Sequence, residues 1–297
     1  MKALIFGSRG FVGPHLESKL KDLEYDVYEF DLKLGNDIRD YEQVHTAVDK
    51  YQPDFIFHLA AMAYVGESEL NPRRAIETHI TGTLNILEAV RQLGLRTKIH
   101  LASTSEEYGY EYQTEEVFED SPTYPTNIYG VTKNAMTNMA RNYIDKYGMH
   151  IVITRAFNHL GTGQGQQPVS ASFARQIALI ERGELDVLSH GNLETMRNFT
   201  DVRDIVAAYE LVIHAPPGVY NVCSDSTVTM EELLYMFTSK AKCKIETQVD
   251  ERYYRPGKVD FMQPSYAKIN LLTGWEPTIS LDDSVAAVLQ DWRERSI

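Results

Sequence analysis

Cysteine is scarce in this chain, with only two among 297 residues. Cys223 and Cys243 stand in no CxxC pattern and have no neighbouring His or Asp at the spacing of metal ligands. This pattern argues against a redox pair and against a metal site. We therefore expect no metal, and we interpret both thiols as buried or incidental residues.

Long apolar runs are also missing, because no stretch approaches the ~20 residues that span a membrane. The amino terminus, Met-Lys followed by four apolar residues, is too short for a signal peptide. Positive charge is deficient, since 29 Lys and Arg against 42 Asp and Glu give a net charge of −13. This balance disfavours binding to nucleic-acid phosphates or anionic lipids. We expect a cytoplasmic protein without nucleic-acid or membrane partners, in which local groups hold any phosphate-bearing ligand.

Apolar strands alternate with amphipathic helices through the first half of the chain, and a hydrophobic content of 43% is enough for a full core. This alternation predicts an α/β fold with a Rossmann-type doubly wound parallel sheet. The expected strands are residues 2–7, 25–31, 54–59, 97–103 and 150–156, and the expected helices are 11–23, 40–50, 71–93 and 126–147.

The pattern changes after about residue 160, where loops rich in Gly, Gln and Pro precede a helix near 169–182 and short strands such as 218–223. We expect a smaller C-terminal substrate-binding domain at the carboxyl edge of the sheet, where open α/β sheets bind ligands. The predicted cofactor-binding domain is 1–160 with about 200–225, and the predicted second domain is 161–199 with 226–297.

Three glycines, Gly7, Gly10 and Gly13, stand where the first strand turns into the first helix. A dinucleotide-binding fold needs glycines there for a tight turn, for close approach of backbone N–H groups to a pyrophosphate, and for helix–strand packing. The alternative is a structural turn. Asp31 ends the second strand, at the distance expected for a carboxylate that binds a ribose 2′-OH. We therefore favour NAD(H), while Arg9 in the loop keeps NADP(H) possible.

Tyr129 and Lys133 lie four residues apart on one face of a predicted helix. A free tyrosine has a pKa of ~10, so a nearby ammonium is needed to stabilise the phenolate during proton transfer near neutral pH. The hydroxyls of Ser103, Thr104 and Ser105 follow a predicted strand, and one of them can bind the substrate oxygen to which Tyr129 transfers a proton. On an ordinary helix, the same spacing has only a structural role.

The ordered blocks of the sequence resemble the extended short-chain dehydrogenase/reductase superfamily over nearly the whole chain. They are GSRGFVG at 7–13, Asp37-Ile38, HLAA at 58–61, GTLNILEA at 82–89, TSEEYG at 104–109, YGVTK at 129–133, RAFNHLGTGQ at 155–164, RNFTDVRD at 197–204 and YNVCS at 220–224. The resemblance implies that Thr104, Tyr129 and Lys133 are the catalytic triad. The expected cofactor contacts are Gly7, Arg9, Gly10, Phe11, Gly13, Asp31, Asp37, Ile38, Leu59, Ala60, Ala61, Tyr129 and Lys133.

Within that superfamily, the segments FNHLGTGQ, SFARQIALIERG and GNLETMRNFTDVRDIV are most similar to GDP-4-keto-6-deoxy-D-mannose reductases. The resemblance implies reduction of a 4-keto sugar by a nicotinamide hydride. Glu106 occupies the position of the general base in GDP-mannose 4,6-dehydratases, so a dehydratase is the alternative function. The structural alternative is that Glu106 or Glu107 is a polar loop residue or a hydrogen-bond partner for sugar hydroxyls. A 4-epimerase and a non-catalytic nucleotide-binding sensor complete the alternatives.

The resemblance further implies a GDP-sugar substrate, bound by Thr104, Ser105, Glu106, Asn158, Arg197 and Arg255. Surface ion pairs are the alternative for the two arginines. We expect His79 and His159 to have structural or positioning roles, because Tyr129 already transfers the proton. His79 replaces the asparagine of many relatives, and RPGK, ending at Lys258, lacks their usual acidic residue. Relatives also pair two helices across a twofold axis, so we expect a homodimer built as a four-helix bundle.

Overall fold

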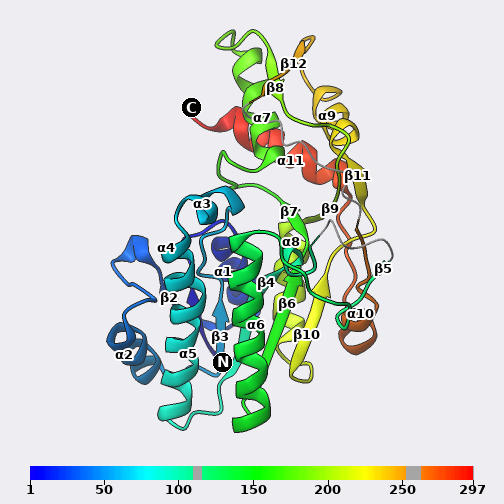
Figure 1. Cartoon of the computed structure of the whole chain (residues 1–297). Helices are drawn as coiled ribbons and strands as arrows, with labels where there is room; N and C mark the ends of the chain where they lie inside the picture. The colour runs from blue at the N-terminus through cyan, green and yellow to red at the C-terminus, as the bar shows by residue number, and fades with distance from the viewer. Residues whose placement is uncertain (110–115, 252–261, 297) are drawn as a thin grey trace.

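The fold centres on a parallel sheet with the strand order β10-β6-β4-β3-β1-β2 (Figure 1). The computed structural model describes residues 1–109, 116–251 and 262–296. The strands of this sheet are β1 (Lys2–Phe6), β2 (Asp26–Phe30), β3 (Phe55–His58), β4 (Lys98–Thr104), β6 (Ile151–Ala156) and β10 (Gly218–Val222). Because β1 lies between β2 and β3, the strand order reverses there, and such a switch point opens a ligand crevice at the carboxyl ends of the strands. The predicted α/β class and doubly wound sheet are confirmed.

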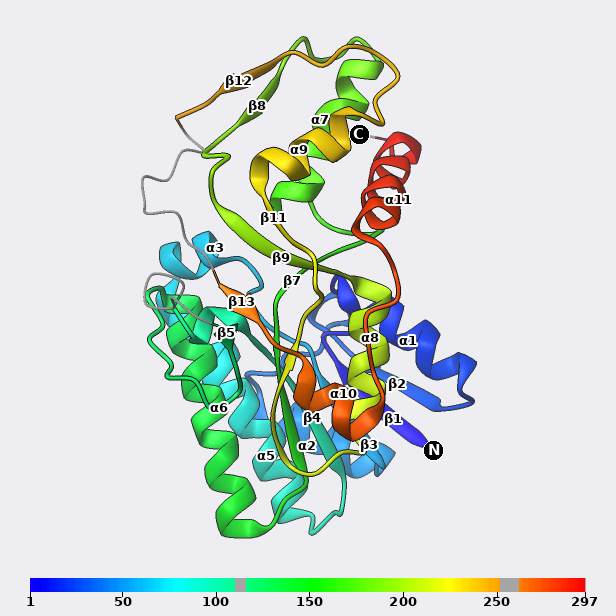
Figure 2. The same cartoon turned by 90° about the vertical axis from the view of Figure 1, so that its right-hand side faces the viewer.

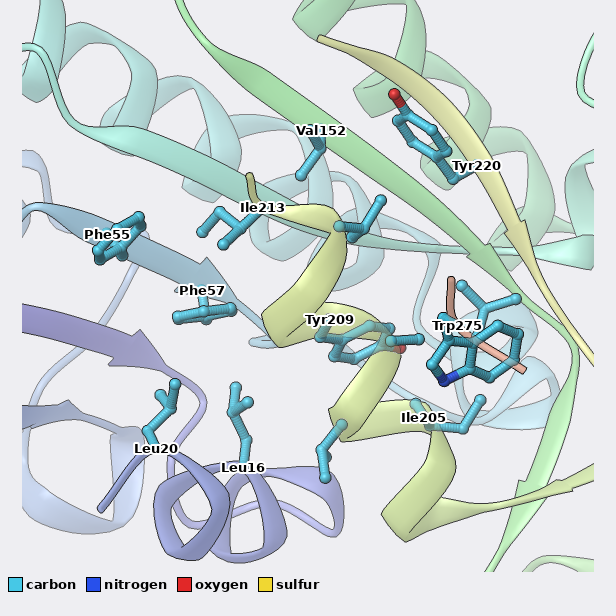
Figure 3. Close-up of a cluster of buried hydrophobic side chains, with 14 of the residues drawn as sticks. Leu16, Leu20, Phe55, Phe57, Val152, Ile205, Tyr209, Ile213, Tyr220 and Trp275 are labelled. Atoms are coloured by element: carbon cyan, nitrogen blue, oxygen red, sulfur yellow. The ribbon is translucent and has the colours of Figure 1, made fainter. Parts of the chain in front are cut away.

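Helices cover both faces of the sheet. One face carries α1 (Val12–Asp22), α8 (Val202–Val212) and α10 (Ala267–Thr273), and the other carries α2 (Tyr41–Tyr51), α5 (Gly82–Gln92) and α6 (Ile128–Tyr147). Figure 3 shows Tyr209 of α8 and Ile213, which follows that helix, lying over the sheet, with Leu16 and Leu20 of α1 beside them. Each buried Leu or Ile in such a layer contributes about 1.5–3 kcal/mol by leaving water.

Capping residues set the ends of α2 and α6. The side chain of Asp40 accepts hydrogen bonds from the first backbone N–H groups of α2, and Asn127 does the same for α6 through Gly130 N. Gly148 ends α6 in the left-handed region at φ 62°, a conformation that glycine adopts without strain. The Asn127 cap fixes where α6 starts, and hence where Tyr129 lies.

The helix expected at 71–93 is interrupted. The structure has α3 (Val65–Leu70), then α4 (Pro72–Ile76), a π-helical turn at Glu77–Thr81, and α5. Thr83 Oγ1 donates to His79 O at 2.6 Å, so a side chain satisfies a backbone carbonyl within the irregular turn. Hydrophobic periodicity does not resolve a one-residue change in hydrogen-bond spacing, which is why the sequence predicted a single helix.

A second core lies beyond the carboxyl edge of the sheet (Figure 2). Its helices α7 (Val169–Glu181), α9 (Met230–Thr238) and α11 (Leu281–Glu294) pack around apolar residues such as Phe173 and Phe237. The short strands are β5 (Glu116–Val117), β7 (Asn158–Leu160), β8 (Leu188–His190), β9 (Met196–Asp201), β11 (Thr227–Thr229), β12 (Thr247–Val249) and β13 (Gln263–Pro264). Ile269 of α10 and Trp275 pack in the core of the sheet.

Within residues 1–109, 116–251 and 262–296, no helix combines the length and apolar character needed to cross a membrane. The same residues contain no group of three His, Cys, Asp or Glu side chains placed to hold a metal ion. Cys223 is buried and Cys243 is exposed, and both are free thiols.

Candidate active site

Two adjoining cavities open at the carboxyl edge of the sheet, with volumes of about 390 and 330 Å³. They share Gly7, Gly10, Leu59 and Ala61, which lie at the ends of β1 and β3. Of the residues expected to bind cofactor or substrate, those that line one or both cavities are Gly7, Gly10, Phe11, Gly13, Asp31, Asp37, Ile38, Leu59, Ala60, Ala61, Thr104, Ser105, Glu106, Tyr129, Lys133 and Asn158.

The glycine loop makes close backbone contacts that a side chain would block. Gly7 has φ 87°, and a Cβ there would lie 2.6 Å from Ala60 N. A Cβ at Gly13 would overlap the carbonyl of Ser8. The start of α1 therefore packs directly against the loop, and its first residues, Val12 and Gly13, line the larger cavity. Free backbone N–H groups at a helix N-terminus bind phosphate, so these residues fit the pyrophosphate of a dinucleotide.

Asp31 connects the end of β2 to the glycine loop. Its Oδ2 accepts from Arg9 N at 2.9 Å, and its Oδ1 accepts from Lys33 N at 2.8 Å. The Arg9 guanidinium lies 2.6 Å from Glu29 Oε2 in a partly exposed ion pair. Arg9 itself lines neither cavity. Its charge is therefore directed to Glu29, and a 2′-phosphate would compete with that carboxylate.

Asp37 and Ile38 form the far wall of the smaller cavity. Arg39 donates from Nε to both oxygens of the Asp37 carboxylate and from Nη2 to Oδ2, and these hydrogen bonds lower the pKa of Asp37. Ile38 is buried against Gly82, where a Cβ would lie 2.9 Å from Ile38 Cγ2. An apolar surface beside a fixed carboxylate suits the adenine ring of a dinucleotide, and Asp37 and Ile38 are among the residues expected to contact the cofactor.

Thr104, Tyr129 and Lys133 meet at the floor of the larger cavity. Thr104 ends β4 and its side chain is hydrogen-bonded to Tyr129. Lys133 lies one turn further along α6, with Nζ 5.9 Å from the centre of the Tyr129 ring and 2.7 Å from its acceptor, Ala102 O. The sequence thus predicted a group of side chains that the fold brings together from two elements.

The electrostatics of this cluster favour a protonated phenol. Loss of solvent raises the pKa of Tyr129, and the nearby Glu106 carboxylate raises it further. Burial also lowers the pKa of Lys133 to about 8, against the opposing effect of Glu107. Below that pH the lysine carries an ammonium charge, and this charge can stabilise a phenolate formed when Tyr129 gives up its proton.

Glu106 stands in a 3₁₀ turn, Ser105–Glu107, at the cavity wall. Its Oε2 accepts from Asn127 Nδ2 at 2.7 Å, and its backbone N–H donates to Thr104 Oγ1 at 3.2 Å. Gly130 allows this turn to approach α6, since a Cβ there would lie 2.7 Å from Glu106 O. The carboxylate is therefore held beside the tyrosine and faces the cavity.

The expected substrate residues are not all brought together. Asn158 lines the larger cavity, and its Nδ2 donates to Asn198 O at 3.3 Å. Arg197 on β9 donates to Met196 O at 2.8 Å and lines neither cavity. Arg255, like the rest of RPGK, lies outside the described residues.

The sequence analysis did not identify Gln164, Ser170 and Tyr64, which line another part of the larger cavity. Gln164 and Ser170 line the larger cavity and bind one another, with Ser170 Oγ donating to Gln164 Oε1 at 3.0 Å. Tyr64 faces the same loop, where a Cβ on Gly165 would lie 2.9 Å from the Tyr64 hydroxyl. Gln164 falls within a block that carried the resemblance, which is the one signal that pointed to this wall.

His159 is stacked on Phe11, with ring centres 5.8 Å apart. Burial lowers its pKa, and its Nδ1 lies 3.0 Å from Phe157 O. A neutral ring with a fixed backbone partner fits the positioning role expected for this histidine.

Known proteins resemble the chain over nearly all of its length. A GDP-6-deoxy-D-mannose reductase of Pseudomonas aeruginosa PAO1 is 30% identical over 99% of this chain and 98% of its own. A GDP-mannose 4,6-dehydratase of Yersinia enterocolitica serotype O:8 is 29% identical over 92% of this chain and 82% of its own. The structure of RMD from Pseudomonas aeruginosa complexed with NADPH has a TM-score of 0.89 at 29% identity, covering 98% of both chains.

A family model described as GDP-mannose 4,6 dehydratase matches residues 32–288. That range contains the predicted triad and extends through both cores of the fold. The likeness to nucleotide-sugar enzymes that the sequence motifs indicated is thereby confirmed, as is the use of an NAD(P) cofactor in this group. The chain belongs to the GDP-mannose 4,6 dehydratase family.

Proposed function

We propose that this chain is an NAD(P)H-dependent reductase of the 4-keto group of a GDP-4-keto-6-deoxyhexose. The observation that carries the proposal is the cluster of Thr104, Tyr129 and Lys133 in a cavity that continues into the glycine loop. The likeness to a GDP-6-deoxy-D-mannose reductase over 98% of that protein supports it, because the Yersinia dehydratase is matched over only 82% of its length.

In the proposed carbonyl reduction, each of these residues has a separate role. Gly7, Gly10 and the first turn of α1 would hold a nicotinamide cofactor, and this cofactor would supply the hydride for C4 when bound. As the C=O π bond breaks, the phenol of Tyr129 donates its proton to O4, and Thr104 donates a hydrogen bond to the same oxygen. The ammonium of Lys133 stabilises the phenolate until water restores its proton.

Asn158, Arg197 and Arg255 are proposed to hold the GDP diphosphate, since a chain of net charge −13 must bind phosphate through local groups. The second core, with the loops that lead to it, would then be the nucleotide-sugar domain. The Arg9 guanidinium is paired with Glu29, and a carboxylate at the position of Asp31 repels a 2′-phosphate. Both features favour NADH over NADPH.

The second candidate function is a GDP-mannose 4,6-dehydratase, and the position of Glu106 on the cavity wall favours it. Dehydration would begin with oxidation at C4, with a bound NAD(P)⁺ as the hydride acceptor. A carboxylate would then remove the C5 proton, the C6 hydroxyl would leave as water, and the same hydride would be returned to C6. Glu106 lies near Tyr129 and is hydrogen-bonded to Asn127. In the reductase, the same carboxylate binds sugar hydroxyls and transfers no proton.

Two assays separate the candidates. With GDP-4-keto-6-deoxymannose, we expect cofactor oxidation equal to substrate consumed, faster with NADH than with NADPH, followed by absorbance at 340 nm. With GDP-mannose and no added cofactor, we expect no 4-keto product. In the reductase, Glu106→Gln keeps kcat within about tenfold, since it removes a charge and no proton transfer.

Formation of a 4-keto product from GDP-mannose, abolished by Glu106→Gln, would instead establish the dehydratase. Glu184→Gln is the control for the loss of one negative charge, because Glu184 is exposed and lies 78 residues after Glu106 in the sequence. If neither substrate reacts, the reductase proposal fails.

We propose a homodimer in which α5 and α6 of two protomers form a four-helix bundle. Leu84 on α5 and Val131 and Tyr147 on α6 are 37%, 46% and 42% exposed, and burial of such side chains drives association. Light scattering at micromolar concentration should give twice the monomer mass of 33.8 kDa. A monomer mass would refute the bundle, and Val131→Glu should give that mass if the bundle is correct.

A further inference from the structure

The π-helical turn Glu77–Thr81 places His79 between the cofactor loop and the catalytic helix. His79 is completely buried, and the reaction proposed above does not use it. π-Helical turns are rare and often occur at functional sites.

On one side, His79 Nε2 accepts a hydrogen bond from Met62 N at 3.0 Å. Met62 follows Leu59–Ala61, the loop that lines both cavities, and itself lines the smaller one. A ring nitrogen that accepts carries no proton, so the hydrogen of the neutral imidazole is on Nδ1. Burial lowers the pKa of His79 to about 3, which keeps the ring neutral.

On the other side, His79 Nδ1 lies 2.7 Å from Thr132 Oγ1. Since Nδ1 carries the hydrogen, it donates to that hydroxyl. Thr132 Oγ1 in turn donates toward Ile128 O at 2.8 Å and Tyr129 O at 3.0 Å. The His79 ring also meets the Tyr129 ring edge-on, with centres 5.6 Å apart.

The backbone of His79 is held as firmly as its side chain. Thr83 Oγ1 donates to His79 O at 2.6 Å, and that hydroxyl lies 2.9 Å from His58 Nε2 at the end of β3. The hydroxyl has one proton, so it accepts from His58. A continuous set of hydrogen bonds thus runs from β3, before the cofactor loop, to the turn that carries Tyr129.

We propose that His79, as the neutral Nδ1–H tautomer, is a positioning residue that couples the cofactor loop at Leu59–Met62 to Tyr129. Its Nε2 fixes the loop, and its Nδ1 fixes the first turn of α6 through Thr132. This inference rests on the proposed function and deepens it, because the two contacts govern different steps: the first governs cofactor binding, and the second governs proton transfer.

Two variants separate the contacts. An asparagine amide reaches about as far as Nδ1, so His79→Asn keeps a donor for Thr132 and loses the acceptor for Met62 N. A glutamine amide reaches about as far as Nε2, so His79→Gln keeps the acceptor and loses the donor. Each variant leaves one buried polar group without its partner, which corresponds to about tenfold in an equilibrium or rate constant.

We expect His79→Asn to weaken NADH binding about tenfold with kcat changed less than about threefold, and His79→Gln to lower kcat about tenfold with NADH affinity retained. Thr132→Val, which removes only the hydroxyl, should behave as His79→Gln does. NADH affinity is measured by cofactor fluorescence without sugar, kcat is measured with saturating sugar, and thermal unfolding confirms that each variant folds.

Equal effects of both His79 variants on binding and turnover, or no effect of either, would overturn the proposal. If a variant does not fold, Thr132→Val supplies the kcat comparison. If the unaltered protein reacts with neither GDP-sugar, the proposed function fails, while NADH binding still decides the inference: unchanged affinity in His79→Asn overturns it.

Discussion

Tyr129→Phe is expected to lower kcat by about 10³-fold, the middle of the range for loss of a positioned acid or base. The substitution removes one oxygen from a ring whose hydroxyl is hydrogen-bonded to Thr104 at the cavity floor. It leaves the glycine loop, Lys133 and the His79 contacts in place, although Thr104 loses a hydrogen-bond partner. NADH affinity should therefore fall by no more than about tenfold, the effect of one lost hydrogen bond.

The measurement is single-turnover oxidation of NADH with GDP-4-keto-6-deoxymannose, with cofactor affinity measured separately. Tyr147→Phe, on the same helix but 42% exposed near its end, is the matched control and should leave kcat unchanged. Retention of more than about a tenth of the activity in Tyr129→Phe would remove this residue as proton donor. A non-catalytic sensor would bind cofactor and turn over no GDP-sugar before any substitution.

Local patterns were enough to predict the elements that build the site. Gly7 and Asp31 end two apolar strands, and Thr104 ends a third, so parallel pairing brings all three to one edge of the sheet. Tyr129 and Lys133 needed only a helix to share a face. A local sequence pattern, combined with the geometry of parallel sheets or of the α-helix, was therefore sufficient to place these residues.

The features that could not be predicted from the sequence depend on contacts between distant segments. The role of His79 comes from Met62 and Thr132, which lie 17 and 53 residues away, and no spacing rule predicts such partners. The helices α9, α10 and α11 follow irregular loops, and their cores form only when they pack on other elements. Arg197 was expected among the substrate residues from its block alone, whereas its place on β9 depends on how that strand pairs with β7 and β11.

A buried ion pair that includes Glu107, whose charge acts on Tyr129 and Lys133, is another such contact. Arg155 on β6 and Glu107 after β4 are 1% and 0% exposed, with Arg155 Nε 2.9 Å from Glu107 Oε2. The other carboxylate oxygen accepts from Thr137 Oγ1 at 2.6 Å and from Ser103 Oγ. The Arg155 guanidinium also lies 4.5 Å from the ring centre of Tyr108. All polar atoms of the carboxylate are thus satisfied by groups from three elements.

Arg155→Met is expected to reduce the free energy of unfolding by about 3–5 kcal/mol, because it leaves the Glu107 carboxylate buried without its partner. Urea denaturation measures this loss. Lys21→Met breaks the exposed pair with Glu17 at 2.5 Å and should cost less than about 0.5 kcal/mol, which makes it the control. A loss below about 1 kcal/mol in Arg155→Met would show that Glu107 does not need the pair.

The double variant Glu107→Gln/Arg155→Met tests whether the loss in Arg155→Met comes from the unpaired charge of Glu107. Since it removes both members of the pair, its loss should be smaller than the sum of the single losses, by at least about 1 kcal/mol for groups in contact. Glu107 closes the same 3₁₀ turn that begins after Thr104 and contains Glu106. If the pair fixes that turn, the double variant should refold and yet raise KM for the sugar, since Thr104 and Glu106 then lose the support that holds them at the cavity wall.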